Sequence, residues 1–182
     1  MLAQRFLATI DALEINEDAA LQAAENFAAS PWGENIRVIH ASLHDFIPSA
    51  TYSLIISNPP FYEDDLHSID ENKNAAHHGT TLKLAALILF VNDHLDINGS
   101  FSLLIPFRRL AYLESIAAAA GLYVREKLLI RQSPSHEYFR VILLLSKNKQ
   151  DNIQMNELVI HDKEKDYTTA FSSLLKDYYL KL

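Results

Sequence analysis

The run YSLIIS (52–57) is short, largely apolar and followed by Asn58 and two consecutive prolines. A continuous apolar run of this length is typical of a strand that is buried on both faces of a parallel sheet. Proline fixes φ and has no N–H group to donate, so two prolines in succession end the strand and keep the chain extended. We therefore expect a rigid turn at the end of a buried strand, with Asn58 just before it and Phe61 just after it.

Apolar runs alternate with amphipathic segments along the rest of the chain, and this alternation predicts a parallel sheet covered by helices. Two adjacent apolar runs around residue 135 predict an antiparallel strand pair at one edge. Ligands bind at the carboxyl ends of strands in such sheets, so we expect Glu14, Ser42 and Asn58 to share one crevice. The expected strands are 6–15, 36–41, 52–57, 100–105, 122–131, 138–146 and 156–161, and the expected helices are 17–30 (capped by Asn16), 80–95, 107–121 and 167–182.

The composition is that of an ordinary globular protein, and we expect one domain over residues 1–182. No uninterrupted apolar run is long enough to span a membrane, and the N-terminus lacks the features of a signal peptide. The chain has no cysteine, so a disulfide framework is excluded and a cytoplasmic location is expected.

The net charge of −7 argues against strong non-specific binding of nucleic acid, but the charge is unevenly distributed. Residues 105–150 carry a net charge of +5, and the rest of the chain is acidic. This basic segment could face phosphates or could simply be solvated surface. Its candidates for phosphate contacts are Arg108, Arg109, Arg131 and Arg140.

Two other features have plain interpretations. The segment 63–71 holds five acids without a base, which indicates solvated surface or a lid over the substrate. Only one pair of the eight histidines, His40 and His44, is four residues apart, and the chain has no cysteine partner for any of them, so we expect no metal site.

The order of these motifs resembles that of class I S-adenosylmethionine-dependent methyltransferases that act on amino groups. Asn58-Pro59-Pro60-Phe61 matches their Asp/Asn/Ser-Pro-Pro-aromatic motif. The whole chain resembles the bacterial tRNA1(Val) adenine-37 N6-methyltransferase family. The matching stretches are MLAQR, IDALEIN, AAENFAASPW, LIISNPPFY, LLIP, RVILLLS and LVIHDKEKDYTTAF.

This resemblance implies a Rossmann-like α/β sheet with helices on both faces and an antiparallel C-terminal strand pair. It also implies S-adenosyl-L-methionine as cofactor and tRNA as partner, and it makes the four arginines candidates for RNA binding. It says nothing of the oligomeric state.

The resemblance gives each residue of the motif a role. The Asn58 side-chain oxygen and the Pro59 carbonyl would accept from the two N–H groups of an exocyclic amine, which localises the nitrogen lone pair for attack on the methyl group. Pro60 would help to fix that carbonyl, and Phe61 would stack on the extruded base, a contact worth about 1–3 kcal/mol. The alternative is a proline-rich turn that only ends a strand.

The resemblance also implies cofactor contacts. Glu14, with Ile15 beside it, would accept from both ribose hydroxyls; the alternative is an acid that only favours the start of the next helix. Many relatives carry an aspartate for the cofactor adenine where this chain has Ser42. Three alternatives follow: Ser42 accepts weakly, Asp45 reaches back, or recognition depends on the Leu43 backbone and apolar contacts.

One departure affects the fold itself. The family's strand order is 3-2-1-4-5-7-6, and strand one is followed by a glycine-rich loop and a helix. Here MLAQRF resembles the end of that helix, and no glycine precedes Gly33. We therefore expect a sheet truncated at its N-terminus, either by truncation of the chain or by a misplaced start, in which strands 6–15 and 52–57 each have an open edge.

Three functions remain open at this point. The first is N6-methylation of an adenine in tRNA, expected at adenine 37 of tRNA1(Val). The second is N5-methylation of a protein glutamine, as in the release-factor type, although that family favours tyrosine where this chain has Phe61. The third is a non-catalytic remnant that binds RNA or a partner.

Overall fold

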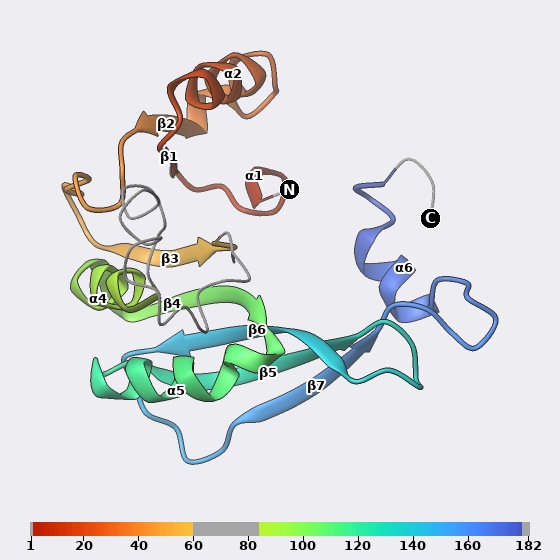
Figure 1. Ribbon diagram of the computed structural model, residues 1–182. Coiled ribbons are helices and arrows are strands. Elements are labelled where there is room, and N and C mark those ends of the chain that lie inside the picture. Colours follow the sequence, from red (N-terminus) through yellow and green to blue (C-terminus); the bar gives the residue numbers. More distant parts are fainter. Residues whose placement is uncertain (1, 60–83, 180–182) are drawn as a thin grey trace, which may run out of the picture. The chain divides into compact units, whose positions relative to one another are not determined.

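A computed structural model describes residues 2–59 and 84–179 (Figure 1). The chain folds as two compact units, residues 1–49 and 50–182, and each is described by itself. The single domain expected over 1–182 concerns both units together and stays a prediction.

The first unit is a parallel strand pair with one helix. Its strands are in register from Ile10 opposite Ile36 to Glu14 opposite His40, so both end at the same level. Asn16 caps the helix as predicted, because its side-chain oxygen accepts from the Ala19 N–H at 2.9 Å. The elements are α1 (Leu2–Arg5), β1 (Ile10–Glu14), α2 (Glu17–Ala28), the 3-10 turn η1 (Gly33–Asn35) and β2 (Ile36–His40).

The second unit is a five-stranded mixed sheet with the order β3-β4-β6-β5-β7 (Figure 1). β3 is parallel to β4, β6 is antiparallel to both β4 and β5, and β7 is parallel to β5. The elements are β3 (Tyr52–Ser57), α4 (Leu84–His94), β4 (Leu95–Pro106), η3 (Phe107–Arg109), α5 (Leu110–Ala119), β5 (Tyr123–Arg131), β6 (Tyr138–Ser146), β7 (Gln154–Val159) and α6 (Thr169–Leu175).

Within each unit, the observed strand order agrees with the expected one. β1 and β2 correspond to strands two and three of the family's order, and β3-β4-β6-β5 corresponds to 4-5-7-6. Within the described residues, β1 pairs with β2 alone and β3 pairs with β4 alone. Each of these strands therefore has one open edge, as expected.

Two details differ from the expectation. The antiparallel pair β5–β6 forms, but it does not make the edge of the sheet, because β7 pairs with the outer side of β5. The connection 147–153 is long enough to bring the chain back across the pair, so β7 can add in parallel. β1 begins at Ile10 rather than at residue 6, since Phe6 and Leu7 are exposed and do not join the ladder.

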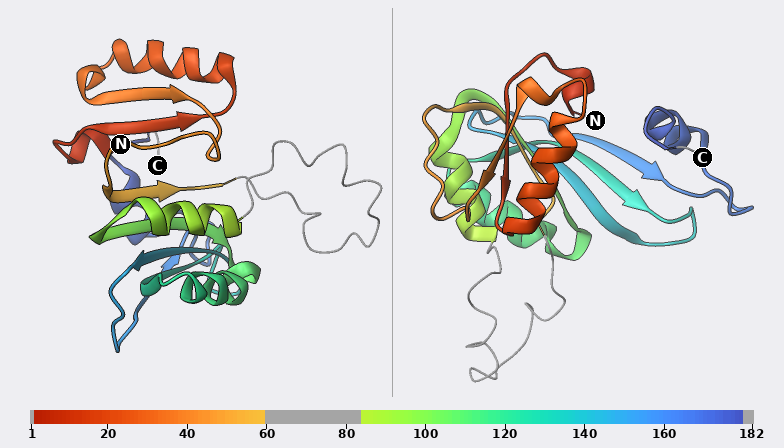
Figure 2. Two further views of the ribbon diagram at one scale, coloured as in Figure 1. Left: turned by 90° about the vertical axis from the view of Figure 1, so that its left-hand side faces the viewer. Right: turned by 90° about the horizontal axis from the view of Figure 1, so that it is seen from above.

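The core of the second unit lies on one face of β4 and β6. The register places Phe101, Leu103 and Ile105 of β4 opposite three apolar residues of β6, and all six side chains are fully buried. Helices α4 and α5 contact each other and bury their own apolar residues (Figure 2). Lys127 of β5 forms an ion pair with Glu114 of α5 at 2.6 Å. Helices on both faces of one sheet would involve both units, and that arrangement stays a prediction.

The most apolar described helices are short. α4 has 11 residues, whereas a membrane-spanning helix needs about 20. No described helix is both long enough and apolar enough to cross a membrane.

Leu103→Ala is expected to lower the free energy of unfolding by about 2–5 kcal/mol, because it leaves a cavity in a fully buried site. Leu104→Ala is the matched control, since this half-buried neighbour points to the other face of β4. Urea denaturation measures both changes. Equal losses would contradict the assignment of the buried face.

Candidate functional site

The two strands of the first unit end beside a fixed carboxylate. Glu14 is the last residue of β1, and its Oε1 accepts from the Asn16 N–H at 2.8 Å. Its backbone oxygen accepts from Ala41 at 3.0 Å, and His40 Nε2 lies 3.2 Å from the Ile15 carbonyl oxygen. The side chain of Ile15 is half exposed. The Glu14 carboxylate is therefore held at the carboxyl end of the strand pair, next to an accessible apolar side chain.

Ser42 and Asp45 form a pair just after the end of β2. The Ser42 hydroxyl donates to Asp45 Oδ2 at 2.5 Å and accepts from the Asp45 N–H at 3.2 Å. The hydroxyl hydrogen of Ser42 is thus committed to Asp45, and a carboxylate is brought back to the end of the strand. Leu43 lies between them and is half-buried. Of the three alternatives for cofactor adenine, this geometry favours Asp45 reaching back.

The predicted acceptor motif begins after β3, as expected, but β3 is not buried on both faces, because its Leu54 and Ile56 are 39% and 47% exposed. Asn58 follows the last residue of β3 and is exposed, whereas Pro59 is buried. The buried ring anchors the turn, and the amide beside it stays accessible. Pro60, Phe61, the acidic segment 63–71 and His77-His78 lie outside the described residues. A crevice shared by Glu14, Ser42 and Asn58 would join the two units, and it stays a prediction.

The structure separates two adjacent arginines on the turn after β4. Arg108 of η3 is exposed, whereas Arg109 is only 9% exposed. Arg140 lies within β6, opposite Pro106, and is half-buried. Among these three candidates, Arg108 is best placed to reach a phosphate, and the burial of Arg109 favours a packing role.

Arg131, at the end of β5, is engaged within the protein. Its Nε and Nη2 donate to Glu157 of β7 at 2.8 and 2.5 Å, and its Nη1 donates to the Pro134 carbonyl at 2.9 Å. Tyr138 donates to the other carboxylate oxygen of Glu157 at 2.7 Å. These contacts link β5, β6 and β7, and they favour a structural role for Arg131 over a phosphate contact.

This network shifts two pKa values in opposite directions. The hydrogen bond from Tyr138, followed by that from Arg131, lowers the pKa of Glu157 below its ordinary value. The same hydrogen bond raises the pKa of Tyr138, because it is lost when the phenol ionises next to a carboxylate.

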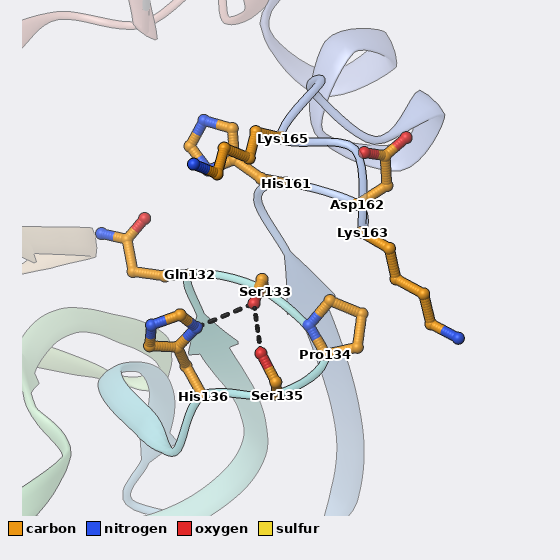
Figure 3. Close-up of a pocket in the computed structure, with 9 residues that line it drawn as sticks. All are labelled: Gln132, Ser133, Pro134, Ser135, His136, His161, Asp162, Lys163 and Lys165. Atoms are coloured by element: carbon orange, nitrogen blue, oxygen red, sulfur yellow. Dashed lines mark hydrogen bonds between the residues drawn. The ribbon is translucent and has the colours of Figure 1, made fainter.

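A pocket that the sequence analysis missed lies between two loops of the second unit (Figure 3). Its volume is about 760 Å³, and it lies between the β5–β6 loop and the β7–α6 loop. The nearest signal in the sequence is the alternation of charges in DKEKD (162–166). The lining residues are Gln132, Ser133, Pro134, Ser135, His136, His161, Asp162, Lys163 and Lys165.

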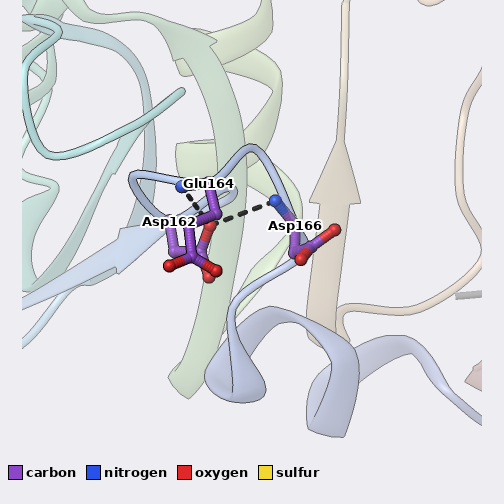
Figure 4. Close-up of side chains that lie close together, drawn as sticks. All are labelled: Asp162, Glu164 and Asp166. Carbon is purple, nitrogen blue, oxygen red and sulfur yellow. Dashed lines mark hydrogen bonds between the residues drawn. The ribbon is translucent and has the colours of Figure 1, made fainter.

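Three carboxylates of the β7–α6 loop lie close together (Figure 4). Asp162, Glu164 and Asp166 each offer an oxygen within 4.8 Å of the others. Asp162 Oδ1 accepts from the N–H groups of Glu164 and Asp166 at 2.8 and 3.1 Å, so its local role is to hold the turn. An exposed acidic cluster does not by itself make a metal site, and the expectation of no metal stays a prediction.

Comparison with known proteins identifies the family. A relative from Flavobacterium johnsoniae, named tRNA1(Val) (adenine(37)-N6)-methyltransferase, is 39% identical over 185 residues, which cover 100% of this chain and 79% of the relative. The chain belongs to this family. A relative of the same name from Pectobacterium carotovorum is 35% identical, and the match covers 99% of this chain and 74% of the relative. No protein-family model matches the chain.

Solved structures confirm the fold class. A predicted O-methyltransferase from Agrobacterium tumefaciens aligns with a TM-score of 0.70 at 18% identity. The alignment covers 97% of this chain and 81% of the chain of that protein. A methyltransferase from Pyrococcus furiosus aligns with a TM-score of 0.57 at 19% identity and covers 81% of this chain and 68% of its own. The α/β architecture is thus the Rossmann-like fold of class I methyltransferases, as expected.

Glu157→Gln is expected to move the pKa of Tyr138 down, back toward its ordinary value of 10.0. The variant removes the carboxylate that disfavours ionisation of the phenol. NMR of ¹³C-labelled tyrosine, titrated from neutral to alkaline pH, measures the change. Glu137→Gln is the control, because this neighbouring acid makes the smallest contribution to the raised pKa of Tyr138. An unchanged Tyr138 titration in Glu157→Gln would contradict the assigned hydrogen bond.

Proposed function

We propose that the protein methylates the N6 amino group of an adenine in tRNA, with S-adenosyl-L-methionine as the methyl donor. The expected target is adenine 37 of tRNA1(Val), the substrate named for its relatives. The observation that carries the proposal is the exposed Asn58 amide, which follows β3 and precedes a buried proline in a chain of this family. The proposed place of action is the cytoplasm, where tRNA is modified.

The chemistry of the acceptor explains why an amide and a bare carbonyl are needed. The lone pair of an exocyclic adenine nitrogen is delocalised into the ring, so this nitrogen is a weak nucleophile. Asn58 Oδ1 and the Pro59 carbonyl would accept its two N–H groups, which favours a pyramidal nitrogen with a localised lone pair. Aimed dipoles and positioning would supply most of the rate enhancement, and no strong base is needed before methyl transfer.

Two other residues of the motif complete this part of the proposal. Pro60 lacks an N–H group and would fix the Pro59 carbonyl in one orientation. Phe61 would stack on the flipped base, which is inexpensive to extrude from a single-stranded loop. Arg108, exposed on η3, would contact the RNA backbone.

The first unit carries groups that fit the cofactor. The Glu14 carboxylate suits two ribose hydroxyls, because a carboxylate can accept from both. Asp45, held by Ser42, would accept from the adenine amino group, and Leu43 and Ile15 would supply apolar contacts to the cofactor. The cofactor supplies the electrophilic methyl group on a sulfonium centre. The residues of this chain bind, orient and exclude water.

Calorimetric titration with S-adenosylhomocysteine tests the cofactor site in this 182-residue chain. We expect stoichiometric binding that is weakened at least about tenfold by Glu14→Gln or Asp45→Asn, since each loses a charge-assisted hydrogen bond. Glu25→Gln, a change of an exposed acid on α2, is the matched control. Absence of binding by both this chain and an N-terminally extended chain would contradict the proposal and favour a non-catalytic remnant.

Asn58→Ala is expected to lower the rate of methyl transfer to tRNA by about 10²–10³-fold, the usual cost of removing one preorganised dipole. Binding of S-adenosylhomocysteine should not change, because the amide serves the acceptor. Transfer of tritiated methyl groups measures the rate on tRNA and on protein substrates, and Asn152→Ala, at an exposed site, is the control. An unchanged rate, or transfer to protein glutamine alone, would contradict the proposal.

A further inference from the structure

The pocket between the two loops lies at the same edge of the sheet as Asn58. β3, β4, β5 and β7 all run in one direction, and β6 runs against them, so these four strands end at one edge (Figure 1). Asn58 follows β3, and the pocket loops follow β5 and β7. Adjacent strands lie about 4.8 Å apart, and the register places Asn58 level with Leu128, four residues before the pocket. The two sites are therefore separated both across and along the strands, by roughly 20–25 Å.

Two lysines and two histidines line the pocket, and the two lysine side chains extend to different sides of it (Figure 3). Lys163 and Lys165 line it together with His136 and His161, and Asp162 is its one acid (Figure 3). Both lysines are exposed, and neither forms an ion pair with the part of the chain that the structure describes. The ammonium groups are therefore available to an anionic ligand.

The two loops are tied together before any ligand binds. The His161 N–H donates to the Gln132 carbonyl at 2.8 Å, and the Ile160 N–H donates to the Arg131 carbonyl at 3.1 Å. Within the β5–β6 loop, Ser133 Oγ lies 2.8 Å from His136 Nδ1. Binding would therefore cost little ordering of the backbone.

Lys165 has an unusual backbone for its residue type. Its φ is +71°, in the left-handed region where glycine or asparagine is more comfortable. Non-glycine residues in this region cluster at functional sites.

We propose that this pocket binds a phosphate group of the tRNA backbone, several nucleotides from the methylated base. This assignment rests on the proposed function, which places the base at Asn58. A stacked strand rises about 3.4 Å per nucleotide, so the separation of the two sites corresponds to roughly six to seven nucleotides. Lysine ammonium groups bind phosphate as point charges, which suits a backbone contact without sequence specificity.

The double variant Lys163→Gln/Lys165→Gln tests the assignment by tRNA binding at a series of salt concentrations. We expect Kd to rise about tenfold at low salt. The slope of log K against log salt is negative and should become shallower by about one to two. KM for S-adenosylmethionine and the rate at saturating tRNA should stay the same. Lys149→Gln is the control, because Lys149 lies near the Tyr123 ring at the opposite edge of the sheet and carries the same charge.

Lys165→Gly separates binding from folding. Glycine removes the cation but accepts a positive φ without strain, so Tm should be unchanged or higher while tRNA binding weakens by about threefold or more. Weaker binding in a variant of undiminished Tm cannot be a consequence of misfolding.

The outcomes distinguish the pocket from the proposed function. If the wild-type chain methylates tRNA and the double variant keeps the wild-type Kd and salt slope, the pocket assignment is overturned and the proposed function stands. If the wild-type chain neither binds nor methylates tRNA, the proposed function fails and the pocket assignment fails with it.

Discussion

The arrangement of the second unit depends on the apolar contact between β4 and β6. Phe101, Leu103 and Ile105 are fully buried opposite apolar residues of β6, and this face is also the side of Lys127, which binds α5. Because β6 runs against β4, and β5 runs against β6, the strands β3, β4, β5 and β7 end at one edge. The groups to which a function is assigned in this unit therefore lie at or near that edge of the sheet.

Both units place chemistry at the last residue of a strand or just beyond it. Glu14 ends β1 and is oriented by the Asn16 N–H, and Asn58 follows β3 and is anchored by the buried Pro59. The Ser42–Asp45 pair follows β2 in the same way. The hydrogen-bonded ladder ends at these positions. The backbone there is held by the strand, whereas the side chains remain accessible to a ligand.

Much of the fold could be predicted because its signals are local. The Asn16 cap, the end of β3 at the prolines, and the runs that form β5 and β6 depend on neighbouring residues. The place of β7 beside β5 could not be predicted, because it depends on pairing between residues that are 28 positions apart in the sequence. The burial of the two adjacent arginines could not be predicted either, because Arg108 is exposed and Arg109 is buried on the same short turn.

The sequence by itself determined where each strand ends and which groups stand there, because proline geometry, helix capping and apolar runs act over a few residues. Only the tertiary structure decided that Arg131 binds Glu157 and that loops 132–136 and 161–165 meet around a pocket. These outcomes require β5 and β7 to lie side by side, and side-chain partners across a sheet are set by register rather than by local sequence.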